Sequence, residues 1–558
     1  MQYKVMGIKK DRRYIKIFLP ILIIIPFLGF FLYFLLFSTS PIYLIRSLLF
    51  DYKPKVVYET FNIYIDPSIS DISKKRIEEG VDDIVFNNVK RFEFVDEKSA
   101  DFVLAISNSK ESVVASKELL PVGHIYWIRD TVNSKELKEV LMEREEYEFA
   151  KEYIERLWDV DVRLVESLPL ELKESEKSIG LIYPSKISKE LKILSLDKEN
   201  VLKEGNDSLL LSYSLEGDQR SDFVLSILKK NVEGISSDTL NRDSLLKINM
   251  TGVTAMSRGL AIKMDSSGNY AYPARDLGKF LADADLTHTS NEASFVEGCA
   301  VYSGMRFCSR PEYIETLKAS GIDIVELTGN HNNDFGAENN SKSIEMYKAL
   351  GWDYFGGGLN TKDSEKILYK EVKGSKVAFL GYNYYDSMLN TMAIAGENRA
   401  GANHYSQSKV ESDIKEAKEN ADVVIVTFQF QECYSYPPSD VIYPICYKPL
   451  STPDQKGVFR SAIDFGADVV VGTQAHQPQT YELYKEGVIY YGLGNLYFDQ
   501  YKWIGTRQGT VLSLYLLEGK VIQTELTPTI YDRDLIPRVA NETEGKLLLE
   551  LLKSARSF

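Results

Sequence analysis

The sequence has few cysteines and no excess of positive charge. Only four cysteines occur among 558 residues, and neither of their two close pairs has the C-x-x-C spacing of a zinc or redox site. Lysine and arginine number 66 against 80 aspartates and glutamates, which gives a net charge of −14. The sequence shows no basic patch broad enough to bind a phosphate backbone, so nucleic acid is not an expected partner.

The composition is that of a folded globular chain. Hydrophobic residues make up 44% and charged residues 26% of the sequence, which excludes disorder, collagen and coiled coil as overall descriptions. A chain of this length is expected to form two or more domains. We find no internal repeat.

One long apolar run stands near the N-terminus. Residues 17–37 carry no charge and are long enough to cross a hydrocarbon core of about 30 Å as a helix. Residues 1–16 hold six lysines and arginines against one acid, so this tail is predicted to stay in the cytoplasm. The prediction is a single-pass protein of the cell membrane with its bulk extracytoplasmic. A cleaved signal peptide or a buried core helix are the alternatives, but the run is longer than a signal core and has no Ala-x-Ala site.

This topology determines the net charge of the external part and the compartment in which the cysteines lie. The tail carries +5, so the external part carries about −19. All four cysteines would lie outside, where disulfides are stable, and their spacing suits two local bridges, Cys299 with Cys308 and Cys433 with Cys446. Three connectivities are open, and four buried free thiols are the alternative.

Two regions of different kind follow the membrane segment. Residues 55–241 alternate strand-like and helix-like runs, with a charged helical stretch expected from Ser134 to Trp158, and predict an α/β domain of unknown role. Residues 245–539 alternate short apolar strands with amphipathic helices and end in hairpin-like runs, which favours a two-sheet α-β-β-α sandwich. Residues 540–558 are expected to form a C-terminal helix.

Polar clusters recur where the apolar strands of the second region end. In open α/β sheets ligands gather at the carboxyl ends of strands, so these side chains are expected to share one pocket. The clusters lie at residues 290–292, 328–336, 427–434, 472–476 and 492–495.

At these residues the sequence resembles the CapA family of capsule and poly-γ-glutamate synthesis proteins, whose domain is similar to calcineurin-like metallophosphoesterases. The resemblance is carried by Leu327–Gly336, Gly466–His476 and Tyr491–Asp499, which match the family's blocks in order. It covers about half of the chain. It implies a membrane-anchored, extracytoplasmic protein of capsule or poly-γ-glutamate biosynthesis with a metallophosphoesterase-like fold.

Three positions depart from the family's metal ligands. Val253 stands where the family has an aspartate, and Gln429 and Gln474 stand where it has histidines. Neutral amides are poor ligands for Zn, Mn or Fe, so the pocket is predicted to be degenerate, holding one divalent cation such as Mg, Ca or Mn, or no metal.

The resemblance implies roles for the remaining polar residues. Glu292, Asn330 and His476 would hold a cation, His331 would act as general acid and Glu432 would orient water. The pocket would be completed by Gln429, Gln474, Asn495 and Asp334. The alternative for each is structural, as in a turn around His331 or Asn495. His124, His288 and His404 lie outside the clusters and are expected to be ordinary surface or core residues.

Two functions of different class follow. The first is a polymer-handling protein or residual metal-dependent hydrolase of capsule or poly-γ-glutamate synthesis, whose partners would be the membrane, an anionic envelope polymer or its precursor, and other membrane proteins of a synthesis complex. The second is a non-enzymatic scaffold or polymer-binding subunit of a cell-envelope assembly, which the substituted ligand positions favour.

Overall fold

The structure is a computed structural model that describes most of the chain after residue 112. The described ranges are 113–217, 237–300, 304–384, 392–430 and 455–557, with 60–66, 92–106 and short stretches between residues 75 and 90. The predicted tail 1–16 and membrane segment 17–37 lie outside the described residues, as do Glu432, Cys433 and Cys446. Among the residues described, no helix is both long and apolar enough to cross a membrane.

The chain divides into two compact units. The first comprises Met1–Tyr64 and Glu79–Phe102, and the second comprises Ile65–Glu78 and Val103–Phe558. In the first unit, strand β1 (Phe61–Ile65) pairs in parallel with β4 (Phe92–Phe94). The rings of Phe92 and Phe102 are buried there and both lie against the ring of Phe61.

The second unit begins with a small α/β part. Its main sheet has the order β10-β9-β11-β7-β12, in which β9 is parallel to its two neighbours and β7 is antiparallel to its own. The bounds are β7, Leu120–His124; β9, Glu139–Glu143; β10, Asp161–Val165; β11, Ile179–Ile182; and β12, Leu191–Ile193. Helix α5 (Leu168–Glu174) packs against this sheet, and β6 (Val113–Glu118) pairs with β14 (Leu210–Gly217).

The helical stretch expected from Ser134 to Trp158 is wrong over its first half. Helix α4 covers only Arg144–Trp158; before it, Ser134–Glu136 form a single 3-10 turn and Glu139–Glu143 form strand β9. The apolar run Val140–Met142 is buried in the sheet, where it pairs with β10 and β11. Tertiary pairing therefore overrides the helix propensity of the surrounding lysines and glutamates.

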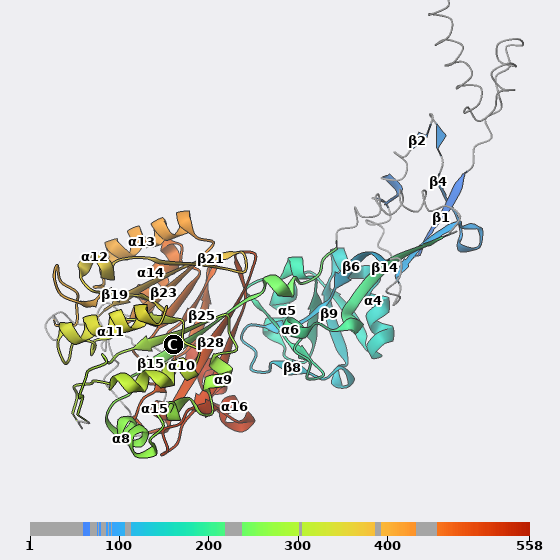
Figure 1. The fold of residues 1–558 in the computed structure, drawn as a ribbon. Helices are drawn as coiled ribbons and strands as arrows, with labels where there is room; N and C mark the ends of the chain where they lie inside the picture. Colours follow the sequence, from blue (N-terminus) through green and yellow to red (C-terminus); the bar gives the residue numbers. More distant parts are fainter. Residues whose placement is uncertain are drawn as a thin grey trace, which may run out of the picture. The chain divides into compact units, whose positions relative to one another are not determined.

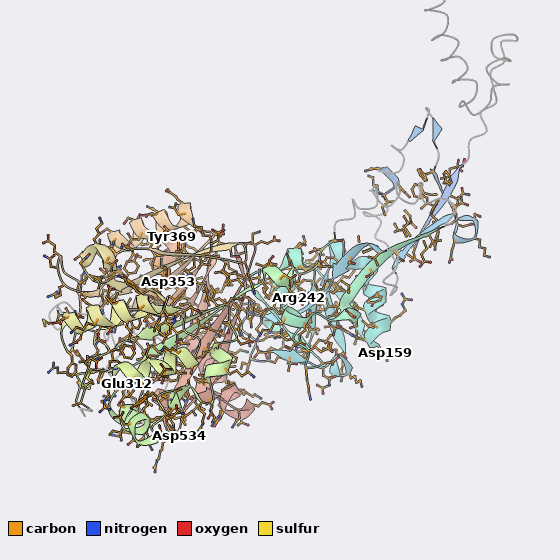
Figure 2. All side chains as sticks on the ribbon, viewed as in Figure 1. Asp159, Arg242, Glu312, Asp353, Tyr369 and Asp534 are labelled. Atoms are coloured by element: carbon orange, nitrogen blue, oxygen red, sulfur yellow. A yellow bond between two sulfur atoms is a disulfide. The ribbon has the colours of Figure 1, made fainter. Side chains whose placement is uncertain are left out.

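Arg242 closes the small part before the chain enters the larger one (Figure 2). Its guanidinium pairs with the buried carboxylate of Glu118 and donates to the carbonyl of Val201 at 2.7 Å. The carboxylate and the carbonyl together hold the guanidinium in place, which fixes the start of the connection.

The larger part contains two mixed sheets, as a mixed α/β fold predicts (Figure 1). The first has eight strands in the order β18-β17-β16-β15-β28-β29-β30, with β27 paired to β15. Its members are β15, Leu246–Thr254; β16, Leu286–Asn291; β17, Ile324–Glu326; β18, Asp353–Phe355; β27, Asn495–Tyr497; β28, Gln508–Leu517; β29, Lys520–Ile530; and β30, Arg538–Val539.

The second sheet has six strands in the order β20-β21-β23-β24-β26-β25. Its members are β20, Leu368–Val372; β21, Ser375–Asn383; β23, Val423–Gln429; β24, Val469–Gly472; β25, Tyr481–Tyr484; and β26, Gly487–Tyr490. The four inner strands are parallel, and all seven residues of β23 are buried. Burial on both faces explains why these strands read as continuous apolar runs.

The two sheets face each other across one core, and helices cover their outer faces. Successive side chains of a strand point to opposite faces of the sheet. In β21, Val377 and Phe379 face the other sheet, whereas Ala378 and Leu380 face helices. Helices α8 (Arg258–Ser267), α9 (Gly278–Leu281), α10 (Ile314–Ala319) and α11 (Ala337–Ala349) cover the first sheet. Helices α13 (Gln407–Asn420) and α14 (Gln455–Phe465) cover the second.

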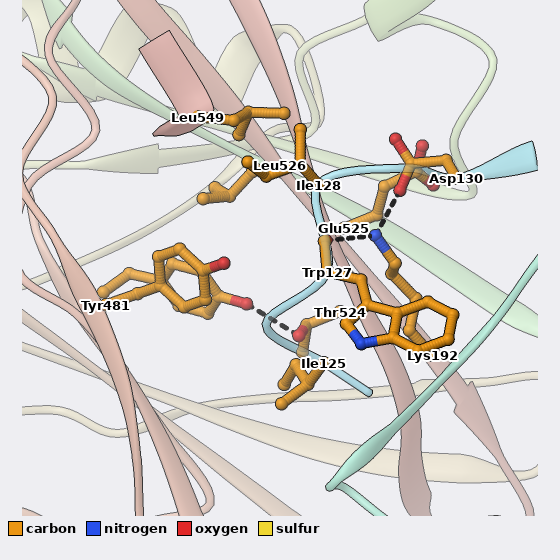
Figure 3. Close-up of a pocket in the computed structure, with 11 residues that line it drawn as sticks. Ile125, Trp127, Ile128, Asp130, Lys192, Tyr481, Thr524, Glu525, Leu526 and Leu549 are labelled. Atoms are coloured by element: carbon orange, nitrogen blue, oxygen red, sulfur yellow. Dashed lines mark hydrogen bonds and ion pairs between the residues drawn. The ribbon is translucent and has the colours of Figure 1, made fainter. Parts of the chain in front are cut away.

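Within the second unit the small part contacts the larger one. The hydroxyl of Tyr126 accepts from the backbone of Leu483 at 2.9 Å, and Gln523 accepts from the backbone of Ile193 at 2.7 Å. A cavity of about 30 Å³ lies between Trp127, Lys192, Tyr481 and Thr524 (Figure 3). It has room for water but not for a ligand.

The last helix, α16 (Glu542–Ser554), packs on β29 and contributes Leu548 and Leu552 to the core between the sheets. Asn541 and Glu544 form a capping box at its start. The chain's end is thereby tied to the larger part.

Candidate functional site

Polar side chains from both sheets meet where the parallel strands end. Glu292 follows β16, Asn330 follows β17, and Gln474 follows β24, while Asn383 and Gln429 are the last residues of β21 and β23. Since the two sheets face each other, their carboxyl ends bring residues far apart in sequence into one cluster. We call these five residues the amide cluster.

Gln429 stands at the centre of the amide cluster. Its Nε2 donates to Asn330 Oδ1 at 2.7 Å, to Glu292 Oε1 at 3.4 Å and to Gln474 Oε1. Glu292, Gln429 and Gln474 are at most 2% exposed, and Asn330 is half-buried. The carboxamide therefore supplies the hydrogen-bond donors for a group of buried oxygen acceptors.

A backbone carbonyl fixes the direction of these hydrogen bonds. Asn383 Nδ2 donates to the carbonyl of Thr328 at 2.7 Å, and this oxygen can only accept. The same Nδ2 also donates to Gln429 Oε1. Gln429 must then present its NH₂ group, not its oxygen, to Glu292, Asn330 and Gln474.

His476 is oriented by a second chain of the same kind. Asn495 Nδ2 donates to the carbonyl of Thr506 at 2.9 Å, so its Oδ1 is the acceptor for His476 Nδ1–H at 2.8 Å. In the neutral ring, Nε2 then carries the lone pair. The His476 ring stacks on Phe498 with centroids 5.1 Å apart.

His331 forms a dyad with Asp334. His331 Nδ1 lies 2.7 Å from Asp334 Oδ2, which also accepts from the backbone N–H of Phe307 at 2.7 Å. The His331 ring packs on Phe307, whose ring contacts Phe498. The side chains of His331 and Asp334 are 16% and 18% exposed. The carboxylate thus holds the imidazole while leaving it reachable from solvent.

The two histidines share one aromatic wall. Phe307 lies against His331, Phe498 lies against His476, and the two phenylalanine rings are 5.6 Å apart. The guanidinium of Arg258 covers both rings, at 4.7 and 4.8 Å, and pairs with Asp499. The structure therefore places His331 and His476 on the same side of the molecule.

Of the other residues expected in the pocket, Val253 is fully buried in β15, where it pairs with Ser290 and Asn495. Glu432 lies outside the described residues. The disulfide expected between Cys299 and Cys308 is present, and Cys433 and Cys446 lie outside the described residues. This bridge closes the segment that carries Phe307.

Two further buried residues support the cluster: Glu326, to which the sequence analysis gave no role, and His288, which it expected to be an ordinary surface or core residue. His288 Nε2 lies 3.0 Å from Glu326 Oε2, and both side chains are fully buried. The hydroxyls of Thr328 and Thr473 donate to Glu326 Oε1, the latter at 2.8 Å. Thr328 also supplies the carbonyl that orients the amide cluster. This pair thus lies directly beneath the cluster and supports it.

The signal for these residues was weak. His288 lies inside strand β16, and Glu326 is the last residue of the short strand β17; a lone polar residue of a strand usually faces solvent. Asn383 could have been found, because it ends a strand as the other cluster residues do.

A two-metal centre does not fit the side chains of the amide cluster. Among the described residues no group of three or more histidine, cysteine, aspartate or glutamate side chains could hold a metal ion. The cluster contains one carboxylate, and the group at its centre is an N–H donor. Cations need acceptors at that point, and transition-metal pairs need imidazoles and a bridging carboxylate.

Comparison with known proteins agrees with the motifs. Residues 247–500 match the family model described as bacterial capsule synthesis protein PGA_cap. The chain is similar to the capsule biosynthesis protein CapA of Bacillus anthracis, with 30% identity over 224 residues, 39% of this chain and 50% of that protein. It is also similar to the PGA biosynthesis protein CapA of Bacillus subtilis, with 26% identity over 249 residues, 44% of this chain and 61% of that protein.

These matches span half to about three fifths of the length of the curated relatives. Among solved structures, an ABC-type phosphate transport receptor from Vibrio cholerae aligns with 32% of this chain and 100% of its own, at 11% identity and a TM-score of 0.25. So low a score supports no conclusion about fold or ligand. The family model, over residues 247–500, and the two relatives agree with the motifs and support the assignment of this part of the chain to the CapA family, the bacterial capsule synthesis proteins.

Proposed function

We propose that this chain is a membrane-anchored, extracytoplasmic component of capsule or poly-γ-glutamate biosynthesis that handles the polymer without a metal-dependent reaction. The family match supports the pathway, since its relatives are named for capsule and PGA biosynthesis. The uncharged run 17–37 after a basic tail supports the anchor. The Cys299–Cys308 disulfide suits an oxidising, extracytoplasmic setting.

The observation that carries this proposal is the amide of Gln429. It donates hydrogen bonds to Asn330 Oδ1 and Gln474 Oε1 and lies 3.4 Å from Glu292 Oε1, so an N–H group stands at the centre of three oxygens that could otherwise bind a cation. Related metallophosphoesterases would hold metal ions at such strand ends. Here the cluster instead joins the ends of the two sheets, which suits a binding or scaffolding role beside an anionic polymer and other membrane proteins.

Two measurements on the full-length chain test this proposal. Elemental analysis after purification without chelators should find Zn, Mn and Fe well below one equivalent per chain. Cells lacking the chain should lose the polymer and regain it on complementation. A stoichiometric transition metal, with phosphodiester or peptide-bond hydrolysis that EDTA abolishes, would contradict the metal-free assignment.

A second function, acid–base catalysis by His331, is favoured by the His331–Asp334 dyad. A carboxylate 2.7 Å from Nδ1 orients the ring and leaves Nε2 for a proton transfer to a leaving group. In this alternative Glu432 would orient the attacking water. Glu292, Asn330 and His476 would hold one hard cation at the position that the Gln429 amide now occupies. It requires the Gln429 side chain to leave the centre of the cluster.

The His331→Ala variant separates the two functions. If His331 is the general acid, its loss should reduce hydrolysis of the substrate polymer at least about 100-fold while the fold is kept. Asp334→Asn should give a smaller loss, because it weakens the hydrogen bond that orients the ring without removing the ring. The matched control is His404→Ala, because His404 is exposed outside the cluster. Normal turnover in His331→Ala would discard the catalytic role.

A further inference from the structure

A large basic cavity lies in the small α/β part of the second unit, away from the amide cluster. Its volume is about 730 Å³, within the range of small-molecule and oligomer sites. The wall contains four cationic side chains, Arg129, Lys135, Lys177 and Lys198, and two carboxylates, Glu136 and Asp197. The cavity therefore has a local excess of positive charge in a strongly acidic chain.

The carboxylate of Asp197 is already engaged. Its Oδ1 and Oδ2 accept from the backbone N–H and the hydroxyl of Ser134, at 2.8 and 2.7 Å. Lys135, Lys177 and Lys198 form no ion pair with any residue in the described part of the chain. Their ammonium groups can therefore interact with an anionic ligand in the cavity.

Arg129 is the residue of this cavity whose buried hydrogen-bond donors lack acceptors. Its Nε and Nη2 are buried and have no hydrogen-bond partner among the described residues. Burial lowers the pKa of the guanidinium from its ordinary value. A buried donor without an acceptor costs stability, so the structure retains this arrangement at a cost that a bound carboxylate would remove.

A rigid aromatic platform holds Arg129 at the cavity. The guanidinium lies 4.6 Å from the centre of the Trp127 ring. Trp127 is fixed through Nε1, which donates to the carbonyl of Leu172 at 2.8 Å, and through its carbonyl, which accepts from Lys192 at 2.7 Å (Figure 3). A Cβ at Gly123 would lie 2.2 Å from this ring, so a glycine is required there.

Lys198 reaches the cavity from a tight turn. Asp197 and Lys198 both have positive φ, 50° and 75°, and Leu196 and Glu199 exchange two backbone hydrogen bonds across them. This is the geometry of a two-residue hairpin turn that usually contains asparagine or glycine. The turn places Lys198 in the lining of the cavity, next to the engaged Asp197.

We propose that this cavity binds the carboxylate groups of an acidic oligomer or polymer, with Arg129 gripping one carboxylate and Lys135, Lys177 and Lys198 attracting its neighbours. The choice of a γ-linked glutamate polymer as that ligand rests on the proposed function. A planar guanidinium matches a carboxylate in two parallel hydrogen bonds, and spaced lysines match a chain of repeated carboxylates. Such a site would provide local positive charge for a polyanion on a chain whose external part is otherwise strongly acidic.

Calorimetry on the full-length chain in detergent tests the site with a γ-linked glutamate oligomer. Arg129→Gln should weaken binding about tenfold or more, and Arg129→Lys, which keeps the charge but not the fork, should recover only part of it. Lys198→Gln should weaken binding about threefold. The matched control is Lys151→Gln, which removes a charge from helix α4 outside the cavity, and it should bind as the wild type does.

The ligand class is tested with two further probes. A γ-linked glutamine oligomer of the same length should not bind, and inorganic phosphate should not displace the glutamate oligomer. Unchanged binding by both Arg129→Gln and Lys198→Gln would overturn the site. Equal binding of the neutral oligomer, or preferential binding of phosphate, would overturn the assignment to carboxylates.

Polymer production in cells separates this inference from the proposed function. In one outcome, the purified Arg129→Gln chain fails to bind the oligomer while cells that carry this variant make normal amounts of polymer. That result would support the site and count against the proposed function. Retained binding together with lost polymer would count against the site alone.

Discussion

Gln429 shows how much one side chain decides in this protein. At a strand end that the family resemblance assigns to a metal-binding histidine, its carboxamide satisfies buried oxygens from both sheets. The direction of these hydrogen bonds follows from the carbonyl of Thr328 through Asn383. The cluster can therefore be tested by a substitution that replaces the N–H donor of Gln429 with an oxygen acceptor.

We expect Gln429→Glu to destabilise the chain and to make its stability depend on divalent cations. The substitution removes the N–H donors and places a second carboxylate close to Glu292 in a buried site, which should cost about 3 kcal/mol in the free energy of unfolding. Ca²⁺ or Mn²⁺ would be held by the oxygens and should restore most of it. Urea unfolding in EDTA and in added metal measures both effects.

Two controls accompany this measurement. The wild type should unfold at the same urea concentration with EDTA and with metal. Gln429→Leu removes the same donors without adding charge, so it should be destabilised and show no rescue by metal. A wild-type chain that loses stability in EDTA would contradict the amide cluster as described.

The sequence reasoning found most of this cluster but not its support. Glu292, Asn330, Gln429 and Gln474 could be anticipated because each lies at a strand end, and parallel strands end at one edge. Asn383, the partner of Gln429 in the other direction, was missed although it also ends a strand, and the pairing of His288 with Glu326 could not be anticipated. Which face of a strand a polar residue occupies depends on register across two sheets, and local sequence does not contain that register.

At the scale of elements, the Cys299–Cys308 disulfide supports the wall of the site. It closes a short loop that ends next to Phe307, whose ring lies against His331 and whose N–H binds Asp334. Replacing both cysteines with serine should lower the free energy of unfolding by about 2–3 kcal/mol, the value expected for a loop of this length.

The same variant should also free the His331 ring. Its ring resonances, followed by NMR at constant pH, should move toward those of an exposed histidine, whereas the His476 resonance should stay. Dithiothreitol should reproduce both effects in the wild type and leave the double serine variant unchanged. Equal stability of variant and wild type would show that the bridge contributes nothing to this wall.

Element prediction succeeded where packing and pattern agree. Strand β23 is buried on both faces and its sequence is a continuous apolar run, so strand was the only reasonable prediction. The run before α4 shows the opposite case. Val140–Met142 are flanked by lysines and glutamates that favour a helix, and only pairing with β10 and β11 makes them a strand.

At the scale of the whole molecule, His124 links the stability of the second unit to pH. It is 3% exposed in β7, and burial, together with the nearby charges of Lys173, Lys553 and Arg556, lowers its pKa from 6.5 to about 4. Lys553 and Arg556 belong to the C-terminal segment, and the guanidinium of Arg556 stacks on Tyr126 beside His124. The histidine therefore lies where the small part meets the end of the chain.

The sign of the effect follows from this lowered pKa. The unfolded chain protonates His124 near pH 6.5, whereas the folded chain resists protonation until about pH 4, so the unfolded state binds more protons in between. His124 therefore contributes no penalty above pH 6.5, and stability falls as the pH drops from 6.5 to 4. At pH 5 the loss should be about 2 kcal/mol.

The variant His124→Asn isolates this contribution from the other titrating groups. Its side-chain oxygen can accept the hydrogen bond that Tyr126 N–H gives to His124 Nδ1, at 3.2 Å, but it does not titrate. The difference in unfolding free energy between wild type and variant should stay constant above pH 6.5 and move in favour of the variant between pH 6.5 and 4. A constant difference down to pH 4 would mean that the histidine titrates normally in the folded chain, and that the contact between the small part and the C-terminal segment does not exclude its charged form.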